Sequence, residues 1–221
     1  MIKGIIFDVD GVLLDSMELW ENLGEIYLES IGKKADEKLK EQLSVRSLEE
    51  GVEYLISEYQ LDGNPQDIMK DINSIMKDYY CEKVLLKEGV EKYLEEFADK
   101  NISMIIATSG NGEFVKKALE RLNVSHFFTD IVTCTEVKKS KRYPDIYIEA
   151  ASRIHLKPEE ILVFEDSYHA ICTVKEAGFK AAAVYDRSNK DKLESIGQKA
   201  DICILDYEGF DKFWTEVENK F

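Results

Sequence analysis

Two aspartates stand two residues apart near the start of the chain, where an apolar run stops abruptly. Gly4-Ile5-Ile6-Phe7 leads directly into Asp8-Val9-Asp10-Gly11. An ionised carboxylate is costly to bury unless a cation or hydrogen-bond donors compensate its charge. One carboxylate held in this way can act as a nucleophile, and a second one beside it can donate and accept protons. Asp8 and Asp10 are therefore the first candidates for chemistry.

Three further polar clusters follow apolar runs later in the chain. Thr108-Ser109-Gly110 comes after ISMIIA, Lys141 lies in the segment after DIVTC, and Glu165-Asp166 comes after ILVF. With the aspartate pair they would supply a nucleophile, a proton carrier, a cradle of hydroxyl and amide groups, a cation and acidic metal ligands. Phosphoryl transfer needs this combination, because fixed donors and cations must meet the charge on the phosphoryl oxygens. The most natural metal is Mg²⁺, which prefers oxygen ligands.

Each cluster also has an ordinary structural interpretation. A D-x-D pair is more often a solvated turn or a helix cap, and Lys141 lies in a basic run that would by default be solvated. Glu165-Asp166-Ser167 could cap the helix that follows it. The order of the clusters, each after a successive strand, favours the chemical interpretation.

Alternating patterns predict the elements that position these clusters. Apolar runs rich in β-branched residues predict strands at Ile2–Phe7, Ile102–Ala107, Asp130–Cys134, Ile161–Phe164, Ala181–Tyr185 and Ile202–Leu205. Helical patterns cover Glu88–Lys100, Glu113–Leu122, Asp145–His155, Ser167–Ala177, a region near Lys190–Ile196, and Tyr207–Phe221. This alternation predicts an α/β fold, a doubly wound, Rossmann-like parallel sheet with helices on both faces. Ligands collect beyond the carboxyl ends of such strands.

Residues 16–85 break the alternation. Their apolar residues repeat at helical spacing without an evident strand. Ser47-Leu48-Glu49-Glu50 reads as a capping box, and Pro65 suits the start of a helix. We therefore expect an α/β core domain of residues 1–15 and 86–221, and an inserted helical domain of residues 16–85.

Composition narrows the class of protein. The chain has 221 residues and a net charge of −15, which argues against nucleic acid or anionic membranes as partners. The four cysteines form no C-x-x-C pair, and we expect free, mostly buried thiols. Neither a signal peptide nor an apolar stretch of roughly 20 residues is evident. These features favour a soluble, cytoplasmic protein. We expect a monomer or a homodimer, and the sequence does not fix which.

Taken together, the motifs resemble the haloacid dehalogenase superfamily, particularly its phosphatase and β-phosphoglucomutase-like branch, over nearly the whole chain. FDVDGVLLDS is similar to the first motif of that family, IIATSGN to the second, SKRYPDIY to the third and VFEDSYHAICTVKEAG to the fourth. The first and fourth motifs are quite specific, whereas the second is generic. The helical insertion is similar to the mobile cap domain of the family.

The resemblance implies a role for each cluster. The implied catalytic residues are Asp8 as nucleophile, Asp10 as acid/base, Thr108 and Lys141. The implied Mg²⁺ ligands are Asp8, Asp10, Glu165 and Asp166, and the implied substrate-binding residues are Ser109, Gly110, Arg46 and Trp20. The expected activity is Mg²⁺-dependent hydrolysis of a small phosphomonoester, a phosphorylated metabolite, through an aspartyl-phosphate on Asp8.

The third motif departs from the family pattern. A proline usually follows its lysine directly, whereas Lys141 is followed by Arg142-Tyr143. The geometry of this loop is therefore an open question at the level of the sequence, and Arg142 would add a charge near the site.

A β-phosphoglucomutase-like sugar-phosphate isomerase is the alternative. Mutases of this branch carry a histidine in the first cap helix, where this chain has Trp20. They also use a cap lysine near the third cap helix, where the alignment suggests Ile75, although Lys77 is close. Arg46 approximately matches a phosphate-binding arginine of the cap, and an ordinary surface role for it is about as well supported. A mutase must hold a bisphosphate in two orientations, so the loss of two polar anchors favours hydrolysis.

Two other classes fit the residues less well. Dehalogenation of 2-haloacids needs neither a metal nor a general acid, and would leave Asp10 and Asp166 unexplained. A phosphorylatable receiver-type module would leave the helical insertion without a role.

Overall fold

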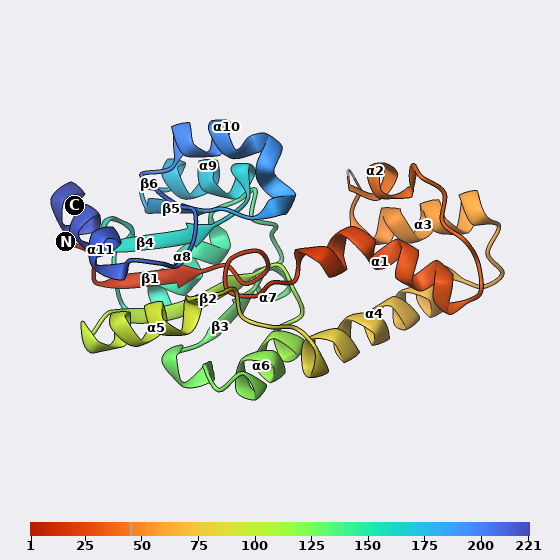
Figure 1. The fold of residues 1–221 in the computed structure, drawn as a ribbon, viewed down its shortest axis with the longest axis horizontal. Helices are drawn as coiled ribbons and strands as arrows, with labels where there is room; N and C mark the ends of the chain where they lie inside the picture. Colours follow the sequence, from red (N-terminus) through yellow and green to blue (C-terminus); the bar gives the residue numbers. More distant parts are fainter. Residues whose placement is uncertain (45) are drawn as a thin grey trace. The chain divides into compact units, whose positions relative to one another are not determined.

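The first strand lies in the interior of a parallel sheet, with other strands on both sides of it (Figure 1). The computed structural model describes residues 1–44 and 46–221, and these include six strands in the order β3-β2-β1-β4-β5-β6. The strands are β1 (Gly4–Phe7), β2 (Ser103–Thr108), β3 (Ile131–Thr133), β4 (Ile161–Glu165), β5 (Lys180–Val184) and β6 (Ile202–Ile204). In the register, Ile6 pairs with Ile105 on one side and with Val163 on the other.

The order of the strands determines where the loops at the carboxyl ends of neighbouring strands lead away in opposite directions. From β1 the chain builds β2 and β3 outward on one side, and then crosses over to build β4, β5 and β6 on the other. The switch in direction therefore lies between β1 and β4, and crevices form at such points in open parallel sheets. Asp8 follows one of these two strands and Asp166 follows the other.

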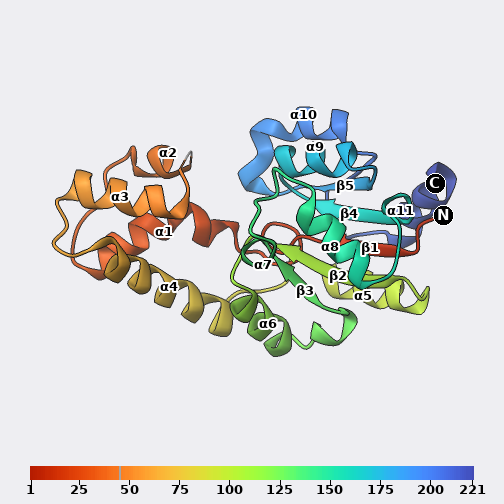
Figure 2. The ribbon, with the colours of Figure 1, turned by 180° about the vertical axis from the view of Figure 1, so that it is seen from behind.

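Helices cover both faces of the sheet because neighbouring strand residues point to opposite sides. On one face α8 (Asp145–Arg153), α9 (Tyr168–Glu176) and α10 (Leu193–Lys199) pack on a buried cluster that includes Ile6 and Ile105 (Figure 2). On the other face α5 (Val90–Asp99) and α11 (Phe210–Lys220) bring aromatic rings against the sheet. The ring of Phe97 lies 6.1 Å from that of Phe7, and the ring of Phe213 lies 5.8 Å from that of Phe164, between centroids.

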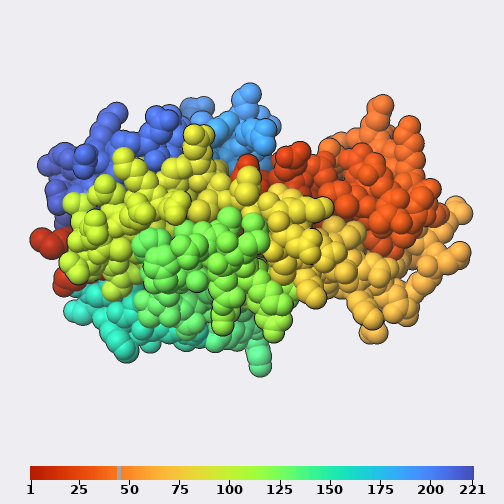
Figure 3. Space-filling model, turned by 60° about the horizontal axis from the view of Figure 1, so that its bottom comes forward, coloured from red at the N-terminus to blue at the C-terminus, as the bar shows by residue number. Residues whose placement is uncertain are grey.

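The remaining helical elements complete this unit. They are α6 (Gly112–Arg121), α7 (Cys134–Val137) and the 3₁₀ segments Ser125–Phe127, Pro158–Glu160 and Arg187–Lys192. Figure 3 shows α5 and α6 on the surface of the unit.

The predicted α/β fold is confirmed, with shifts of one or two residues at the strand ends. The strand expected at Asp130–Cys134 ends at Thr133, because the hydroxyl of Thr133 accepts a hydrogen bond of 3.1 Å from the backbone N–H of Glu136 and starts α7. The helix expected near Lys190–Ile196 is a 3₁₀ segment that continues into α10.

The chain divides into two compact units, residues 1–15 with 84–221, and residues 16–83. The smaller unit is helical, with α1 (Met17–Ser30), α2 (Leu39–Ser44), α3 (Leu48–Tyr59) and α4 (Pro65–Glu82). The capping box is present: Ser47 Oγ accepts from Glu50 N at 3.2 Å, and Glu50 Oε2 accepts from Ser47 N at 2.8 Å. Pro65 opens α4 as expected. That this unit acts as a cap stays a prediction.

The four cysteines are free, but their expected burial is wrong. Cys81, Cys134 and Cys172 are half-buried, and Cys203 is exposed. Cys203 lies on the edge strand β6 between two buried residues, so the alternation of the strand turns it outward. In the described part of the chain, the helices are too short or too polar to cross a membrane.

Candidate active site

The polar residues that end β1, β2 and β4 lie at one edge of the sheet because the strands run parallel. Asp8 follows Phe7, and its backbone N–H donates to the carbonyl of Phe164 at 3.0 Å, so the ladder continues to the start of the loop. Thr108 is the last residue of β2, and Glu165 is the last residue of β4. Sequence reasoning expected these clusters to meet here.

Lys141 joins two of the acidic clusters. Its Nζ atom lies 2.6 Å from Oδ1 of Asp8 and 2.6 Å from Oε1 of Glu165. The side chain of Lys141 is only 11% exposed, and that of Glu165 is 1% exposed. Burial would lower the pKa of the Lys141 ammonium, but Asp8 and Glu165 outweigh it and raise the pKa above its usual value. Lys141 is therefore a fixed, buried positive charge.

The missing proline of the third motif does not displace this lysine. The backbone N–H of Tyr143 donates to the carbonyl of Ser140 at 3.0 Å, which closes a turn around Lys141. Tyr143 is 52% exposed, and the ammonium nitrogen of Lys139 lies over its ring, 4.6 Å from the ring centroid. Arg142 is exposed.

Three carboxylates form a group that fits a divalent cation. One oxygen each of Asp8, Glu165 and Asp166 lie within 4.8 Å of one another. The pKa of Asp8 is raised well above its usual value, chiefly by burial. The positive charge of Lys141 lowers this pKa, but the negative charges of Glu165 and Asp166 raise it further. Burial, followed by the nearby Glu165, raises the pKa of Asp166 to about 7. This crowding of negative charge and the all-oxygen donor set suit Mg²⁺.

Asp10 is not in that group of carboxylates in the described structure, so its metal role stays a prediction. Its carboxylate lies toward the loop after β2 instead. A Cβ atom placed on Gly110 would stand 3.4 Å from Oδ2 of Asp10 and 3.2 Å from Oγ1 of Thr108. Gly110 N donates to Thr108 Oγ1 at 2.9 Å. Asp10, Thr108 and Gly110 therefore border one small space.

Ser109 lies differently from its neighbours. Its side chain is exposed, and Oγ lies 3.3 Å from Sγ of Cys134. The hydroxyl thus points to the end of β3, and the predicted contact of Ser109 with substrate stays a prediction.

Sequence reasoning missed several residues of this region. Tyr147 donates from its hydroxyl to Oε1 of Glu165 at 2.9 Å. The ammonium of Lys87 donates to the carbonyl of Gly11 at 2.9 Å and to Oδ2 of Asp186 at 2.9 Å. Tyr147 lies on α8, the helix that follows Lys141, and this closeness along the chain is a signal by which the sequence could have indicated it. Lys87 has none, because its partners are far from it along the chain.

Asn189 was missed as well. Its side-chain amide donates to the carbonyl of Asp166 at 3.0 Å and so supports the loop after β4 from a distant part of the chain. No motif marks Asn189 in the sequence.

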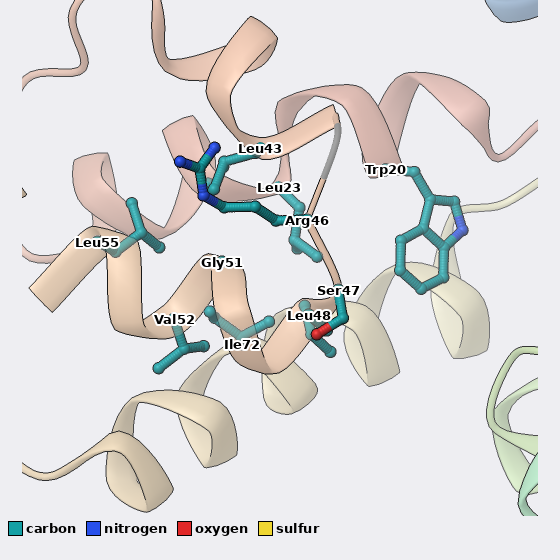
Figure 4. A pocket seen from close by; sticks show the side chains of 11 residues that line it. Trp20, Leu23, Leu43, Arg46, Ser47, Leu48, Gly51, Val52, Leu55 and Ile72 are labelled. Atoms are coloured by element: carbon teal, nitrogen blue, oxygen red, sulfur yellow. The ribbon is translucent and has the colours of Figure 1, made fainter.

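Arg46 and Trp20 line a pocket of about 130 Å³ within the smaller unit (Figure 4). The guanidinium of Arg46 donates to the carbonyl and the side chain of Gln42, and its central carbon lies 4.5 Å from the ring centroid of Tyr54. Trp20 Nε1 donates to the hydroxyl of Tyr80 at 3.0 Å. Both side chains thus have partners inside this unit, and Arg46 points away from Trp20 (Figure 4). Their predicted contact with substrate stays a prediction.

Comparison with known proteins identifies the family. Residues 5–184 match the model of the haloacid dehalogenase-like hydrolases. A phosphorylated carbohydrates phosphatase from Thermotoga maritima is 29% identical, with 81% of this chain and 83% of that protein covered. A β-phosphoglucomutase from Bacillus subtilis is 28% identical, with 83% of each chain covered.

Solved structures agree with these relatives. A Thermotoga maritima protein assigned as a β-phosphoglucomutase superposes with a TM-score of 0.83 at 28% identity, over 98% of this chain and 100% of that one. The strand order, the acidic edge of the sheet and these matches lead to one conclusion: the chain belongs to the haloacid dehalogenase-like hydrolases.

Proposed function

We propose that the protein is a Mg²⁺-dependent phosphatase that hydrolyses a small phosphomonoester through an aspartyl-phosphate on Asp8. The observation that carries this proposal is the buried contact of Lys141 with both Asp8 and Glu165, beside Asp166. Such a cluster of opposite charges is costly to bury for stability alone. A divalent cation would balance the excess negative charge of the three carboxylates and could then attract an anionic substrate.

In the first step, the carboxylate of Asp8 attacks the phosphorus atom. A bond forms between an oxygen of Asp8 and phosphorus, and the bond from phosphorus to the ester oxygen breaks. Lys141, Thr108 and backbone N–H groups near Gly110 stabilise the charge on the phosphoryl oxygens. The position of Lys141 supports this role, because its ammonium lies beside Asp8, the proposed nucleophile.

Asp10 serves as the acid and then as the base. In its protonated form it gives a proton to the leaving ester oxygen. A water molecule then attacks the phosphorus of the aspartyl-phosphate, Asp10 accepts its proton, and the bond to Asp8 breaks to release phosphate. The proximity of Asp10 to Gly110 and Thr108 supports this role, because those residues border the space for the phosphoryl group.

Asp8, Glu165 and Asp166 would hold Mg²⁺, which supplies positive charge beside the phosphoryl oxygens. The raised pKa values of Asp8 and Asp166 support the assignment, since burial leaves the charges of these two carboxylates poorly balanced without a metal cation.

The substrate class is a phosphorylated sugar or a similar small metabolite. The name of the Thermotoga relative, a phosphorylated carbohydrates phosphatase, supports this class. The resemblance gives the smaller unit the role of a cap that contacts the leaving group, and its pocket lined by Trp20 and Arg46 is the surface of that unit to test.

The test measures phosphate release from a panel of sugar phosphates and other small phosphomonoesters, with Mg²⁺ and with chelator. Wild type should turn over many times with Mg²⁺ and stop with chelator. Asp8→Asn should release no phosphate, while Asp211→Asn, an exposed residue on α11, should match the wild type. Activity in the Asp8 variant would contradict the mechanism.

The β-phosphoglucomutase-like alternative has support from the Bacillus relative. Against it, Arg46 is bonded to Gln42 and stacked on Tyr54, and Trp20 stands where a mutase histidine is expected. Interconversion of hexose phosphates primed by a bisphosphate, without net release of phosphate, would establish the mutase instead.

A further inference from the structure

Two donors converge on a single oxygen of Glu165. The hydroxyl of Tyr147 on α8 lies 2.9 Å from Oε1, and Nζ of Lys141 lies 2.6 Å from the same atom. Tyr147 is fully buried, and Glu165 is 1% exposed. Lys141 alone would balance the charge of the Glu165 carboxylate, so the additional hydrogen bond from Tyr147 needs a separate explanation.

The two contacts fix the orientation of the carboxylate. Rotation of the carboxyl group of Glu165 would break both bonds to Oε1 at once. The other oxygen, Oε2, accepts a long hydrogen bond of 3.4 Å from the backbone N–H of Ser167. A carboxylate oxygen can accept about two hydrogen bonds or metal contacts, so Oε2 keeps room for a cation.

The ring of Tyr147 does not need its hydroxyl for packing. It lies in the apolar cluster under α8 and faces the ring of Phe179, 6.3 Å away between centroids. A phenylalanine would fill that space, and a buried hydroxyl is costly unless it is bonded. The role of the hydroxyl is therefore its hydrogen bond to Glu165, and not the packing of the ring.

We propose that Tyr147 is a positioning residue for the metal site: its hydroxyl holds Oε1 of Glu165, so that Oε2 is presented to a divalent cation. This inference rests on the proposed function, because the cation is the Mg²⁺ of the phosphatase. Tyr147 itself touches neither the cation nor the substrate. Hydrogen-bond partners of metal ligands of this kind typically change metal affinity or activity 10- to 100-fold.

The test is a calorimetric titration of Mg²⁺ into metal-free wild type and Tyr147→Phe, which removes the hydroxyl and keeps the ring. We expect Mg²⁺ to bind about 10- to 100-fold more weakly to the variant. Phosphatase activity should recover to within a few-fold of wild type when Mg²⁺ is raised to saturation, since the reacting groups are unchanged.

Tyr93→Phe is the matched control. Tyr93 is 2% exposed, and its hydroxyl donates to the carbonyl of Glu208 at 3.2 Å, so this variant also loses one buried hydroxyl. It should leave Mg²⁺ affinity unchanged. Equal weakening in both variants would overturn the inference, because the effect would then follow from any lost hydroxyl.

The remaining outcomes separate the inference from the proposed function. Equal Mg²⁺ affinity in wild type and Tyr147→Phe would overturn the inference alone. A loss of activity that saturating Mg²⁺ does not restore, with affinity unchanged, would overturn it too. A wild type that binds no Mg²⁺ would overturn the proposed function and this inference with it.

Discussion

The ammonium of Lys87 lies 2.9 Å from Oδ2 of Asp186, and their side chains are 17% and 8% exposed. The same ammonium donates to the carbonyl of Gly11, in the loop that carries Asp8 and Asp10, and to the carbonyl of Tyr185 after β5. The pair therefore ties the loop after β1 to the loop after β5. The pair lies beside the loop of the proposed catalytic residues and contributes no reacting atom to the proposed mechanism.

Lys87→Met should destabilise the protein because it leaves the carboxylate of Asp186 buried without this partner. The expected cost is about 3 kcal/mol in the free energy of unfolding. Urea denaturation measures it. Lys3→Met is the control, since its ion pair with Glu160 is at the surface, with side chains 56% and 24% exposed, and should cost less than about 1 kcal/mol.

The effect of Lys87→Met should also depend on pH. Burial would raise the pKa of Asp186, but hydrogen bonds from Lys87 and Ser188 outweigh it and lower the pKa below its ordinary value of 3.8. A lowered carboxyl pKa adds stability above the unfolded value, and this stability is lost as pH falls through the folded value. The difference between wild type and variant should shrink below about pH 4, and a constant difference would contradict the assignment.

Lys141→Met should abolish most of the activity. It removes the buried charge that contacts Asp8, so we expect kcat/KM for phosphate release to fall by about 100-fold or more. Lys139→Met serves as the control, since that exposed lysine lies over Tyr143, in the same basic run. Similar losses in the two variants would show that the run acts only through its general charge.

Mg²⁺ should stabilise the protein more at high pH than at low pH. The pKa of Asp166 is raised from 3.8 to about 7, chiefly by burial and by Glu165. Between these values the metal-free folded state binds a proton that the unfolded state does not, so its stability falls as pH rises through this window. Mg²⁺ should reverse that loss by binding the ionised carboxylates.

The measurement for this prediction is the melting temperature with Mg²⁺ and with chelator at about pH 5.5 and about pH 8. The gap between the two curves should be wider at the higher pH. Asp166→Asn should remove most of the widening. A gap that is the same at both pH values would contradict the shifted pKa.

Gly110→Ala should impair catalysis more than folding. The added Cβ would stand 3.2 Å from Thr108 Oγ1 and 3.4 Å from Asp10 Oδ2, in the space assigned to the phosphoryl group. The φ angle of Gly110 is not positive, so the backbone itself tolerates alanine. We expect kcat/KM to fall by about tenfold or more, through lost alignment of the reacting groups, with little change in melting temperature.

Gly197→Ala is the matched substitution for this experiment. Gly197 lies in α10, where the new Cβ would meet Sγ of Cys203 at an ordinary 3.4 Å. Alanine favours the helix by about 1 kcal/mol over glycine, so this variant should be fully active and slightly more stable. If it lost activity to the same degree as Gly110→Ala, the steric argument at Gly110 would fail.

The sequence by itself determined the order of the elements and the family. Local hydrophobic periods distinguish strands from helices, and the parallel arrangement follows from their alternation. Thus Asp8, Thr108 and Glu165 could be expected at one edge of the sheet, since each ends or follows a strand. The capping box at Ser47 and the helix start at Pro65 were equally readable, because both signals act over a few neighbouring residues.

Only the tertiary structure decided which atoms meet. Lys141 and Glu165 are 24 positions apart, and Lys87 and Asp186 are 99 positions apart, so no local pattern encodes either contact. The convergence of Tyr147 and Lys141 on one oxygen of Glu165 depends on the packing of α8 on the sheet, against β1, β2 and β3. The turn of Asp10 toward Gly110 depends on the loops after β1 and β2. Contacts of this kind are set by the packing of whole elements, which the periodicity of a sequence does not contain.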